Sequence, residues 1–351
     1  MNEQSDIQTQ IQTLANEIKT FVEREKAKIV QSVNTGMLFT YWHVGKMIAE
    51  RQSILNIDNQ TDRQFILALS KELSKLAGKG FSRSNLFNMR MFYFNYPNVQ
   101  TLSGHLTWSH YCELITVSDI DKRSFYQIES ERNNWSIREL QRQIETSLFE
   151  RLVLSQGAKN KEIVAQLATK GNELNKPEDF IKQPFVLEFL SLPENKPLKE
   201  KDLESKLIRH IEMFLLELGK GFMFVGSQQR ITLNNTNYYV DMVFYNKILK
   251  AYILIDLKRR KLKPADSGQM NMYLNYYKTE INDSDDNLPI GIILCTEKDS
   301  IAAEYILSGL DNQIFAGQYT LCIPNKEKLI AEVKQVMKHD KQMIEKQVAN
   351  I

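Results

Sequence analysis

Apolar residues recur at helical spacing through the first 157 residues, and no alternating stretch there is long enough to predict a strand. The clearest series is Ile7, Ile11, Leu14, Ile18 and Phe21. Such a series is typical of an amphipathic helix that packs against a partner. Residues 34–36 are either a break between two helices or part of one long helix. The pattern predicts an all-α N-terminal region.

Two of the predicted helices, residues 63–76 and 83–94, are separated by a glycine-containing turn, and Ser82 can cap the second helix. This layout resembles a helix-turn-helix, whose second helix reads nucleic acid. The polar residues of the second helix that suit base edges and phosphates are Arg83, Ser84, Asn85 and Asn88. We expect them to bind nucleic acid, and the alternative is an ordinary helical hairpin with a polar outer face.

Residues 158–183 are polar and charged with little periodicity, which predicts an interdomain linker. It separates a helical domain, residues 1–157, from a second domain, residues 184–351. Within the helical domain, Ser136 followed by Glu139 fits a capping box at the start of a helix.

After Pro197 helices begin to alternate with strands. An amphipathic helix is predicted over residues 204–218, and the apolar run that follows, residues 222–233, is two strands or one bent strand. The remaining predicted elements are strands at 239–245 and 251–258, a helix at 267–277, a central strand at 290–295 and a terminal helix at 327–348. The predicted order is therefore helix, three or four strands, helix, strand.

Asp241 and Asp256 each lie within an apolar predicted strand, where an unpaired carboxylate costs several kcal/mol. Asp256 and Lys258 alternate along one strand, so both point to the same face. If Asp241 shares that face, the two carboxylates repel each other unless a cation binds between them. Mg²⁺ is the expected cation, with Mn²⁺ as the alternative. Such an ion can activate water and stabilise charge on a phosphoryl oxygen, which predicts phosphodiester hydrolysis assisted by Lys258.

The combination of Asp241 with Asp256-Leu257-Lys258 resembles the PD-(D/E)XK nuclease motif, and the element order resembles the αβββαβ core of those nucleases. Five sequence segments resemble the YhcG family and its N-terminal DUF1016-type domain: residues 80–86, 108–111, 214–222, 226–229 and 268–274. The resemblance covers most of the chain. It implies an α+β protein, in which an all-α domain precedes an α/β restriction-endonuclease-like domain.

The resemblance also implies roles for single residues. Asp241 and Asp256 would bind the metal, Lys258 would be the catalytic lysine, and Gln269 would be a further active-site residue rather than a surface amide. Many such folds add a glutamate from the first helix, and Glu204 is the candidate because it shares the apolar seam of that helix. The alternative for Glu204 is a first-turn acid that the helix dipole favours. Val240 stands where the motif has a proline, a departure that is frequent in the superfamily.

Composition and charge add little. The net charge of +2 neither requires nor excludes nucleic acid. The basic run beside the strand acids is Arg259, Arg260, Lys261 and Lys263. We expect it to face a phosphate backbone, the alternative being a solvated loop. The three cysteines are far apart in apolar contexts, which predicts buried free thiols, and neither a membrane span nor a secretory signal is found, so a cytoplasmic protein is expected.

The sequence therefore predicts a magnesium-dependent nuclease that acts on DNA, with a helical domain that recognises substrate. A competing hypothesis is a protein of the same fold that has lost catalysis and only binds nucleic acid or assembles a complex. A third hypothesis makes the N-terminal half an oligomerisation module, because its apolar faces exceed what one small bundle needs. A homodimer is expected because cutting two strands is most simply done with two active sites. DNA versus RNA, substrate structure and biological role stay open.

Overall fold

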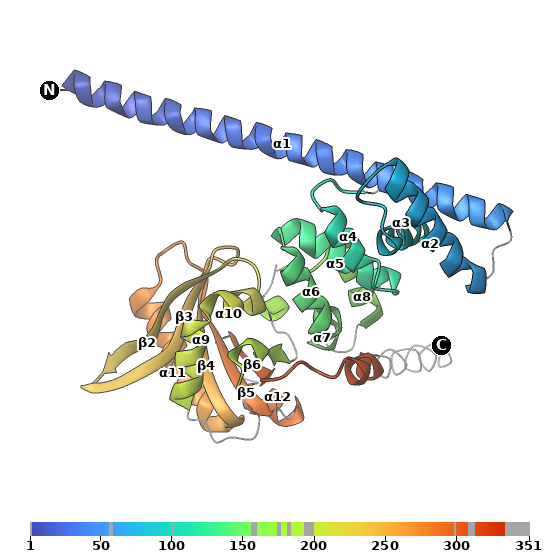
Figure 1. Ribbon diagram of the computed structural model, residues 1–351. Coiled ribbons are helices and arrows are strands. Elements are labelled where there is room, and N and C mark those ends of the chain that lie inside the picture. Colours follow the sequence, from blue (N-terminus) through green and yellow to red (C-terminus); the bar gives the residue numbers. More distant parts are fainter. Residues whose placement is uncertain are drawn as a thin grey trace, which may run out of the picture. The chain divides into compact units, whose positions relative to one another are not determined.

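The computed structural model describes residues 2–55, 59–99, 102–155, 160–173, 177–180, 184–192, 200–297, 300–307 and 313–333. Its contacts divide the chain into two compact units (Figure 1). The first comprises Met1–Arg123 with Ser130–Leu140, and the second comprises Ser124–Glu129 with Gln141–Ile351. None of the described helices is both long enough and apolar enough to cross a membrane.

The first unit is built on one long helix, α1, which runs unbroken from Asn2 to Ile54 (Figure 1). Residues 34–36 therefore lie inside a helix and are not a break. The helices that complete this unit are α2 (Asn59–Leu76), α3 (Arg83–Asn95), α4 (Trp108–Leu114) and parts of α5 (Ile120–Asn133) and α6 (Ile137–Glu145). Gly45 lets α1 approach α3 closely, because a Cβ there would lie 2.0 Å from the Met89 carbonyl oxygen. The all-α prediction for this region is confirmed.

Local capping explains where these helices begin. Ser82 caps α3 as predicted, since its hydroxyl accepts a hydrogen bond from the Asn85 amide at 3.2 Å. The turn between α2 and α3 uses Gly78 and Gly80 at φ of 79° and 112°, a backbone region that favours glycine. The capping box of Ser136 and Glu139 is also present, with reciprocal bonds between side chain and amide.

The second unit contains a mixed six-stranded sheet in the order β1-β6-β5-β4-β3-β2. The strands are β1 (Phe185–Val186), β2 (Phe222–Leu233), β3 (Thr236–Asn246), β4 (Ala251–Lys261), β5 (Ile290–Glu297) and β6 (Gln313–Thr320). Strands β2, β3 and β4 pair antiparallel, whereas β5 pairs parallel with both β4 and β6. The run at 222–233 is thus one bent strand, and the short β1 joins the edge of the sheet beside β6.

Helices cover both faces of this sheet (Figure 1). Those on one face are α9 (Glu200–Arg209) and α10 (Ile211–Leu218), and those on the other are α11 (Pro264–Tyr276), a π-helical turn (Tyr277–Ile281) and α12 (Ser300–Leu307). Alternate residues of β4 enter the two apolar layers: Ile253 and Ile255 pack with α9 and α10, and Leu254 packs with α11. The predicted α/β architecture is confirmed.

Several boundaries differ from the predictions. The predicted helix at 204–218 is two helices that meet at His210. The predicted linker contains the helix α8 (Asn160–Lys170) and a short 3₁₀ turn (Pro177–Phe180). Cysteines are free as expected, but only Cys295 is buried, while Cys322 is exposed. The terminal helix is seen only to residue 333, and the rest of its predicted span lies outside the described residues.

A buried charge network joins α7 (Leu148–Ser155) to α10. Arg151 and Glu217 are both fully buried and form an ion pair, and the Glu217 carboxylate also accepts the Val186 amide at 3.0 Å. Arg142 pairs with Glu188 at 2.7 Å and approaches Glu217 at 3.5 Å. Each charge has a partner, which offsets the cost of burial. These contacts place α7 in the second unit, and the predicted domain boundaries at 157 and 183 remain predictions.

Candidate active site

The candidate site lies where strands β3 and β4 separate. Their paired residues end at Met242 and Ile255, after which β3 continues with β2 alone and β4 with β5. Asp241 is the first residue beyond the last pair, and its Oδ2 accepts a hydrogen bond from the Leu257 amide at 2.8 Å. A side-chain carboxylate thus takes the place of a backbone carbonyl at the point of separation.

Strand β2 is distorted opposite Asp241. Gln228 lies between the pairs Ser227–Met242 and Gln229–Val240, is itself unpaired in the register, and has a φ of 48°. Positive φ is uncommon for a residue with a Cβ atom, and such strained residues cluster at functional sites. The face alternation of β3 also slips here, because Val240 and Val243 enter the same apolar layer.

The Gln228 side chain connects two acids. Its Nε2 donates to Glu204 Oε2 at 2.8 Å and to Asp241 Oδ1 at 3.3 Å, which links α9 to β3. Burial raises the pKa of Glu204, and the nearby Asp241 carboxylate adds to the rise. Of the acids on α9 and α10, Glu204 shares the Gln228 side chain with Asp241, and the charge of Glu200 also raises the pKa of Asp241. Glu217 belongs to the buried network described above.

Asp256 and Lys258 lie on the same face of β4, with Lys258 Nζ 2.7 Å from Asp256 Oδ2. Asp256 is only 3% exposed, and its Oδ2 makes no contact with hydrogen-bond geometry. Burial is the main reason that the pKa of Asp256 is raised to about 7; the Lys258 ammonium opposes the rise and the Asp241 carboxylate adds to it. Burial likewise raises the pKa of Asp241.

Lys258 is the cation closest to these acids. Burial favours its neutral form, but the charge and hydrogen bond of Asp256 together with the charges of Asp241 and Glu200 outweigh burial, so the pKa of Lys258 is raised. We call Glu204, Asp241 and Asp256 the acid cluster. Lys258 acts on Asp241 and Asp256, and the charge of Lys201 acts on Glu204, so two lysines serve three carboxylates and the cluster is short of positive charge.

Gln269 reaches this region through Tyr273. The Gln269 amide donates to the Tyr273 hydroxyl, which itself donates to the Tyr239 carbonyl at 3.0 Å. Burial raises the pKa of Tyr273, and the charges of Asp256 and Asp241 contribute, so the hydroxyl lies within reach of their field. Gln269 is thus placed one side chain away from the acids.

Sequence reasoning assigned no role to Gln228 or Tyr273. Gln228 stood within the phrase 226–229 that resembles the family, in a run already suspected of bending. Tyr273 follows Gln269 by four residues, which places both on one face of a helix. The family resemblance of residues 226–229 and the spacing of Gln269 and Tyr273 are visible in the sequence. Neither observation assigns a function to Gln228 or Tyr273 without the tertiary structure.

The basic run after Asp256 has varied surroundings. Arg260 forms a bidentate pair with Asp266, with both contacts at 2.7 Å, and the Arg259 amide donates to Glu200 at 3.1 Å. Lys261 and Lys263 are exposed. Contact of this run with a phosphate backbone remains a prediction, with Arg260 already anchored at the start of α11.

The four predicted residues of α3 also differ in their surroundings. Arg83 and Ser84 are exposed on the first turn. The Asn85 side chain is bonded internally, to the Gly80 carbonyl and to the Trp108 indole N–H at 2.8 Å. Asn88 contacts the Cys112 sulfur at 3.5 Å. Asn85 therefore holds the turn in place, and nucleic-acid contact by these residues remains a prediction.

The donor set fits a divalent metal ion. Across the described ranges, no group of three or more His, Cys, Asp and Glu side chains is already arranged to hold one. However, Mg²⁺ is usually held by one or two carboxylates together with waters and substrate phosphate. Asp241 and Asp256 supply two carboxylates, and the buried Asp256 Oδ2 has Lys258 Nζ at 2.7 Å as its charged partner.

Comparison with known proteins agrees with this geometry. Residues 178–335 match the YhcG PDDEXK nuclease domain, and residues 17–151 match the DUF1016 N-terminal domain. The chain is 36% identical over 344 residues to "Putative nuclease YhcG" of Escherichia coli (strain K12), covering 89% of this chain and 90% of that protein. The match to the crystal structure of a repair endonuclease from Pyrococcus abyssi is 17% identical, covers 38% of this chain and 50% of that chain, and has a TM-score of 0.27. The chain belongs to the YhcG family, and its second half is a PD-(D/E)XK nuclease domain.

Proposed function

We propose that this protein hydrolyses phosphodiester bonds in DNA, using a divalent metal ion, Mg²⁺ or Mn²⁺, held by Asp241 and Asp256. The observation that carries the proposal is the buried Asp256 carboxylate, whose pKa is raised to about 7 although Lys258 Nζ lies 2.7 Å away. Two buried carboxylates with one lysine need a further positive charge. A divalent ion supplies that charge.

Each side chain of the site has a defined task. When bound, the ion would lower the pKa of a water molecule and stabilise charge on the phosphoryl oxygen. Lys258 keeps its proton because its pKa is raised, so it acts as a hydrogen-bond donor that orients water or stabilises developing negative charge. The Leu257 amide fixes the orientation of Asp241. Gln228 holds Glu204 beside Asp241, where Glu204 can serve as a third ligand directly or through water.

DNA is the proposed substrate, and the exposed Lys261 and Lys263 would attract its backbone near the site. The first helices would contribute binding through Arg83, Ser84 and Asn88. We place this activity in the cytoplasm, a reducing compartment in which the exposed thiol of Cys322 stays free.

A nuclease assay tests the proposal. Linear, branched and single-stranded DNA, and RNA, are incubated with the protein in Mg²⁺, in Mn²⁺ or in EDTA, beside Asp256→Ala and Lys258→Ala. Lys247→Ala, in the exposed turn between β3 and β4, is the matched control for loss of a lysine. We expect metal-dependent cleavage of DNA that only the two site variants lose. Cleavage that persists in them overturns the assigned site, and binding without cleavage by the natural protein favours the catalytically silent alternative.

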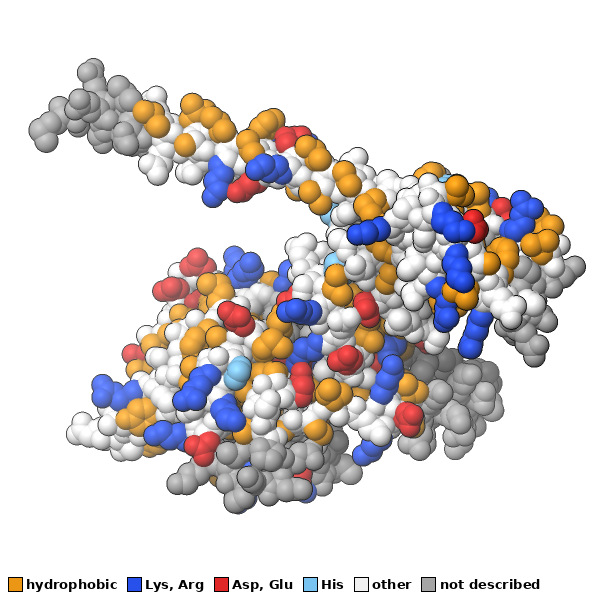
Figure 2. Space-filling model, in the orientation of Figure 1, with side chains coloured by type: hydrophobic (Ala, Val, Ile, Leu, Met, Phe, Trp, Pro, Cys, Tyr) orange, Lys and Arg blue, Asp and Glu red, His pale blue; other side chains and the backbone are white. Residues whose placement is uncertain are grey.

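We further propose that the protein is a homodimer in which the N-terminal half of α1 packs against α1 of a second copy. Ile11, Leu14, Ile18 and Phe21 follow the spacing of a coiled-coil seam, yet each is 55–57% exposed. Ile29 and Val33, also exposed, extend the apolar surface of α1, so it spans residues 11–33, or 23 residues and about 33 Å at the rise of a helix. Figure 2 shows hydrophobic side chains along this part of the helix.

We assign this surface to a second copy because isoleucine at alternate seam positions, with Leu14 and Phe21 between, is typical of paired identical helices. Exposed apolar stripes of this length mark interaction surfaces. Ile18→Lys should convert a dimer into a monomer in analytical ultracentrifugation, while Thr20→Lys, on the opposite side of the helix, should leave the dimer intact. A monomer for the natural protein at micromolar concentration overturns this proposal.

A further inference from the structure

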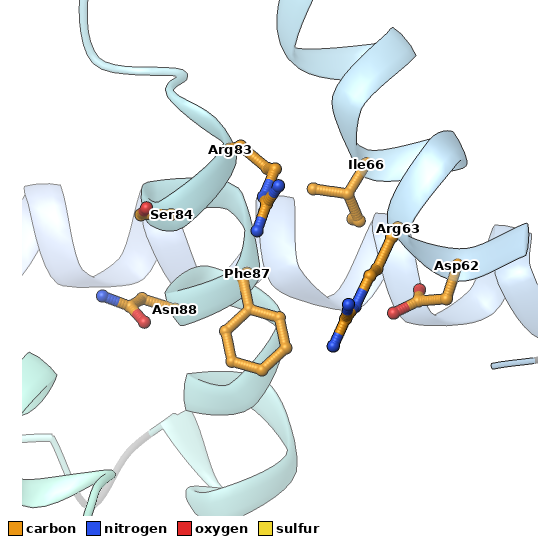
Figure 3. Close-up of a pocket in the computed structure, with 7 residues that line it drawn as sticks. All are labelled: Asp62, Arg63, Ile66, Arg83, Ser84, Phe87 and Asn88. Carbon is orange, nitrogen blue, oxygen red and sulfur yellow. The ribbon is translucent and has the colours of Figure 1, made fainter. Parts of the chain in front are cut away.

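A pocket of about 420 Å³ lies between α2 and α3 in the first unit (Figure 3). It is lined by Asp62, Arg63, Ile66, Arg83, Ser84, Phe87 and Asn88. Figure 3 shows the Arg63 and Arg83 side chains extending into the same space, on the side of Phe87. This volume is within the range of pockets that hold small molecules. We call it the arginine pocket.

The charges around the arginine pocket are unbalanced. Asp62, the only acid of its lining, is occupied by Arg90, which donates to both carboxylate oxygens, and by Gln52. The Arg90 hydrogen bonds hold the pKa of Asp62 below its ordinary value. Within the described residues, neither Arg63 nor Arg83 forms a hydrogen bond or an ion pair. The charge of Arg63 also acts on Asp62, which Arg90 already neutralises, so three arginines share one acid, and this excess of positive charge favours an anion between Arg63 and Arg83.

An aromatic ring lies beside these cations. Phe87 is 45% exposed, although the neighbouring Ile66 is only 2% exposed. The Arg90 guanidinium covers the Phe87 ring at 5.2 Å from its centroid, which holds the ring in place. Exposed aromatic rings beside arginines are the usual platform for nucleobases in single-stranded nucleic acid. Ser84 and Asn88 add polar groups on the adjacent wall.

The two arginines and the Phe87 ring together indicate which ligand the arginine pocket binds. A phosphate would satisfy Arg63 and Arg83 but would leave Phe87 without a partner. Bases of an intact duplex are stacked on each other and present no free face to a ring. We propose that the arginine pocket binds one unpaired nucleotide of a DNA strand, with its phosphate between Arg63 and Arg83 and its base stacked on Phe87. The inference rests on the proposed function in so far as nucleic acid is the substrate, and it gives the protein a preference for DNA with single-stranded segments.

Equilibrium binding tests the inference without cleavage. Fluorescence anisotropy is measured in EDTA with a labelled oligothymidine and with a duplex of equal length, across a series of salt concentrations. The variants are Arg63→Gln, Arg83→Gln and Phe87→Leu. Lys79→Gln is the control, because Lys79 is exposed in the turn before α3 and does not line the pocket. Circular dichroism melts check that each variant is folded.

Each variant has its own expected signature. Arg63→Gln and Arg83→Gln should weaken oligothymidine binding by about tenfold and reduce the salt slope by about 1 each. Phe87→Leu should weaken oligothymidine binding by about fivefold or more, with the salt slope and duplex binding unchanged. Lys79→Gln should bind as the natural protein does. Equal losses for single strands and duplex in Phe87→Leu, or no loss in the arginine variants, overturn the proposal.

The outcome is separable from that of the nuclease assay. Asp256 does not line the arginine pocket, so each pocket variant should lose the same fraction of oligothymidine binding in an Asp256→Ala background, even if that background cleaves nothing. If cleavage does not depend on Asp256 but the pocket variants bind weakly, the proposed function fails and the pocket assignment stands. If the pocket variants bind normally while cleavage requires Asp256, only the pocket assignment fails.

Discussion

The acid cluster has an excess of negative charge, and the arginine pocket has an excess of positive charge. The two sites differ in what lowers the free-energy cost of that excess. The acids lie within or against a sheet, where burial raises the pKa of Glu204, Asp241 and Asp256. The arginines stand at the surface of a helical hairpin, where water solvates them at little cost. Excess charge on buried acids is offset by a proton or by the proposed cation, whereas excess charge on exposed arginines is offset by water and a nearby anion. The comparison predicts that single substitutions in the acid cluster change the cleavage rate strongly, whereas single substitutions in the arginine pocket change the binding affinity by smaller steps.

The largest effect is expected from Asp256→Asn. It removes a negative charge from the acid cluster with almost no change in shape, so metal-dependent cleavage should fall on the order of 10³-fold, the scale at which preorganised electrostatic groups act. Asp286→Asn is the matched control, because Asp286 bonds to the Tyr245 hydroxyl at 2.8 Å away from the cluster. Single-turnover cleavage rates measure both. Equal activity in the two variants would remove Asp256 from the mechanism.

Gln228→Gly distinguishes the hydrogen bonds that Gln228 makes to the acids from the backbone strain at this position. Glycine tolerates the φ of 48°, but it cannot bond to Glu204 or Asp241. We expect the cleavage rate to fall by about tenfold to a hundredfold, since a misplaced catalytic group has effects of this order. The melting temperature should stay the same or rise. A parallel loss of both activity and stability would instead make Gln228 a purely structural residue.

The stability of the metal-free protein should depend on pH through Asp256. Its pKa is raised from an ordinary 3.8 to about 7. Between these two pH values the folded chain therefore keeps the Asp256 proton, whereas the unfolded chain has lost it. Stability from this group is therefore complete below pH 4 and is lost as the pH rises through about 7. Melting temperatures in EDTA should show this decline, and Asp256→Asn should flatten it relative to Asp286→Asn. An identical decline in both variants would assign it to other groups.

The smallest effect is expected at the arginine pocket from Asp62→Asn. This change removes the one acid of the pocket lining and releases Arg90, so oligothymidine binding at low salt should become a few-fold tighter. Stability should fall by about 1–3 kcal/mol because Arg90 loses a charged hydrogen-bond partner. Anisotropy and thermal melts measure the two quantities. Weaker binding in a folded variant would contradict an anion site.

Much of the fold was predictable because its signals are local. Helical spacing, the Ser82 cap and alternation in the strands depend on neighbours within a few positions, and each is confirmed. Asp241 and Asp256 were identifiable as candidate site residues because a carboxylate within an apolar strand is costly to bury unless it has a partner. The break at His210 was missed, since apolar residues continue at helical spacing through both helices.

Long-range effects were not readable from the sequence. The role of Gln228 depends on a local backbone distortion opposite Asp241, at a φ of 48°, and on a residue 24 positions earlier on α9. The arginine pocket requires that α2 and α3 bring Arg63 and Arg83 together, although they are separated by a turn and most of a helix. Asn85 was predicted to contact nucleic acid, but its bonds to Gly80 and Trp108 depend on how α4 packs. Such roles follow from tertiary contacts.

The hydrogen bond from the Leu257 amide to Asp241 would couple binding of the proposed ion to the local opening of the sheet. An ion that binds the ionised Asp241 also holds the acceptor of that amide in place. By thermodynamic linkage, an ion that favours the closed junction is itself favoured by closure. Hydrogen exchange at the Leu257 amide should therefore slow as divalent ion is added, while amides in the distal part of the β2–β3 hairpin keep their rates. A single amide proton thus provides a spectroscopic report on metal loading that needs neither substrate nor turnover.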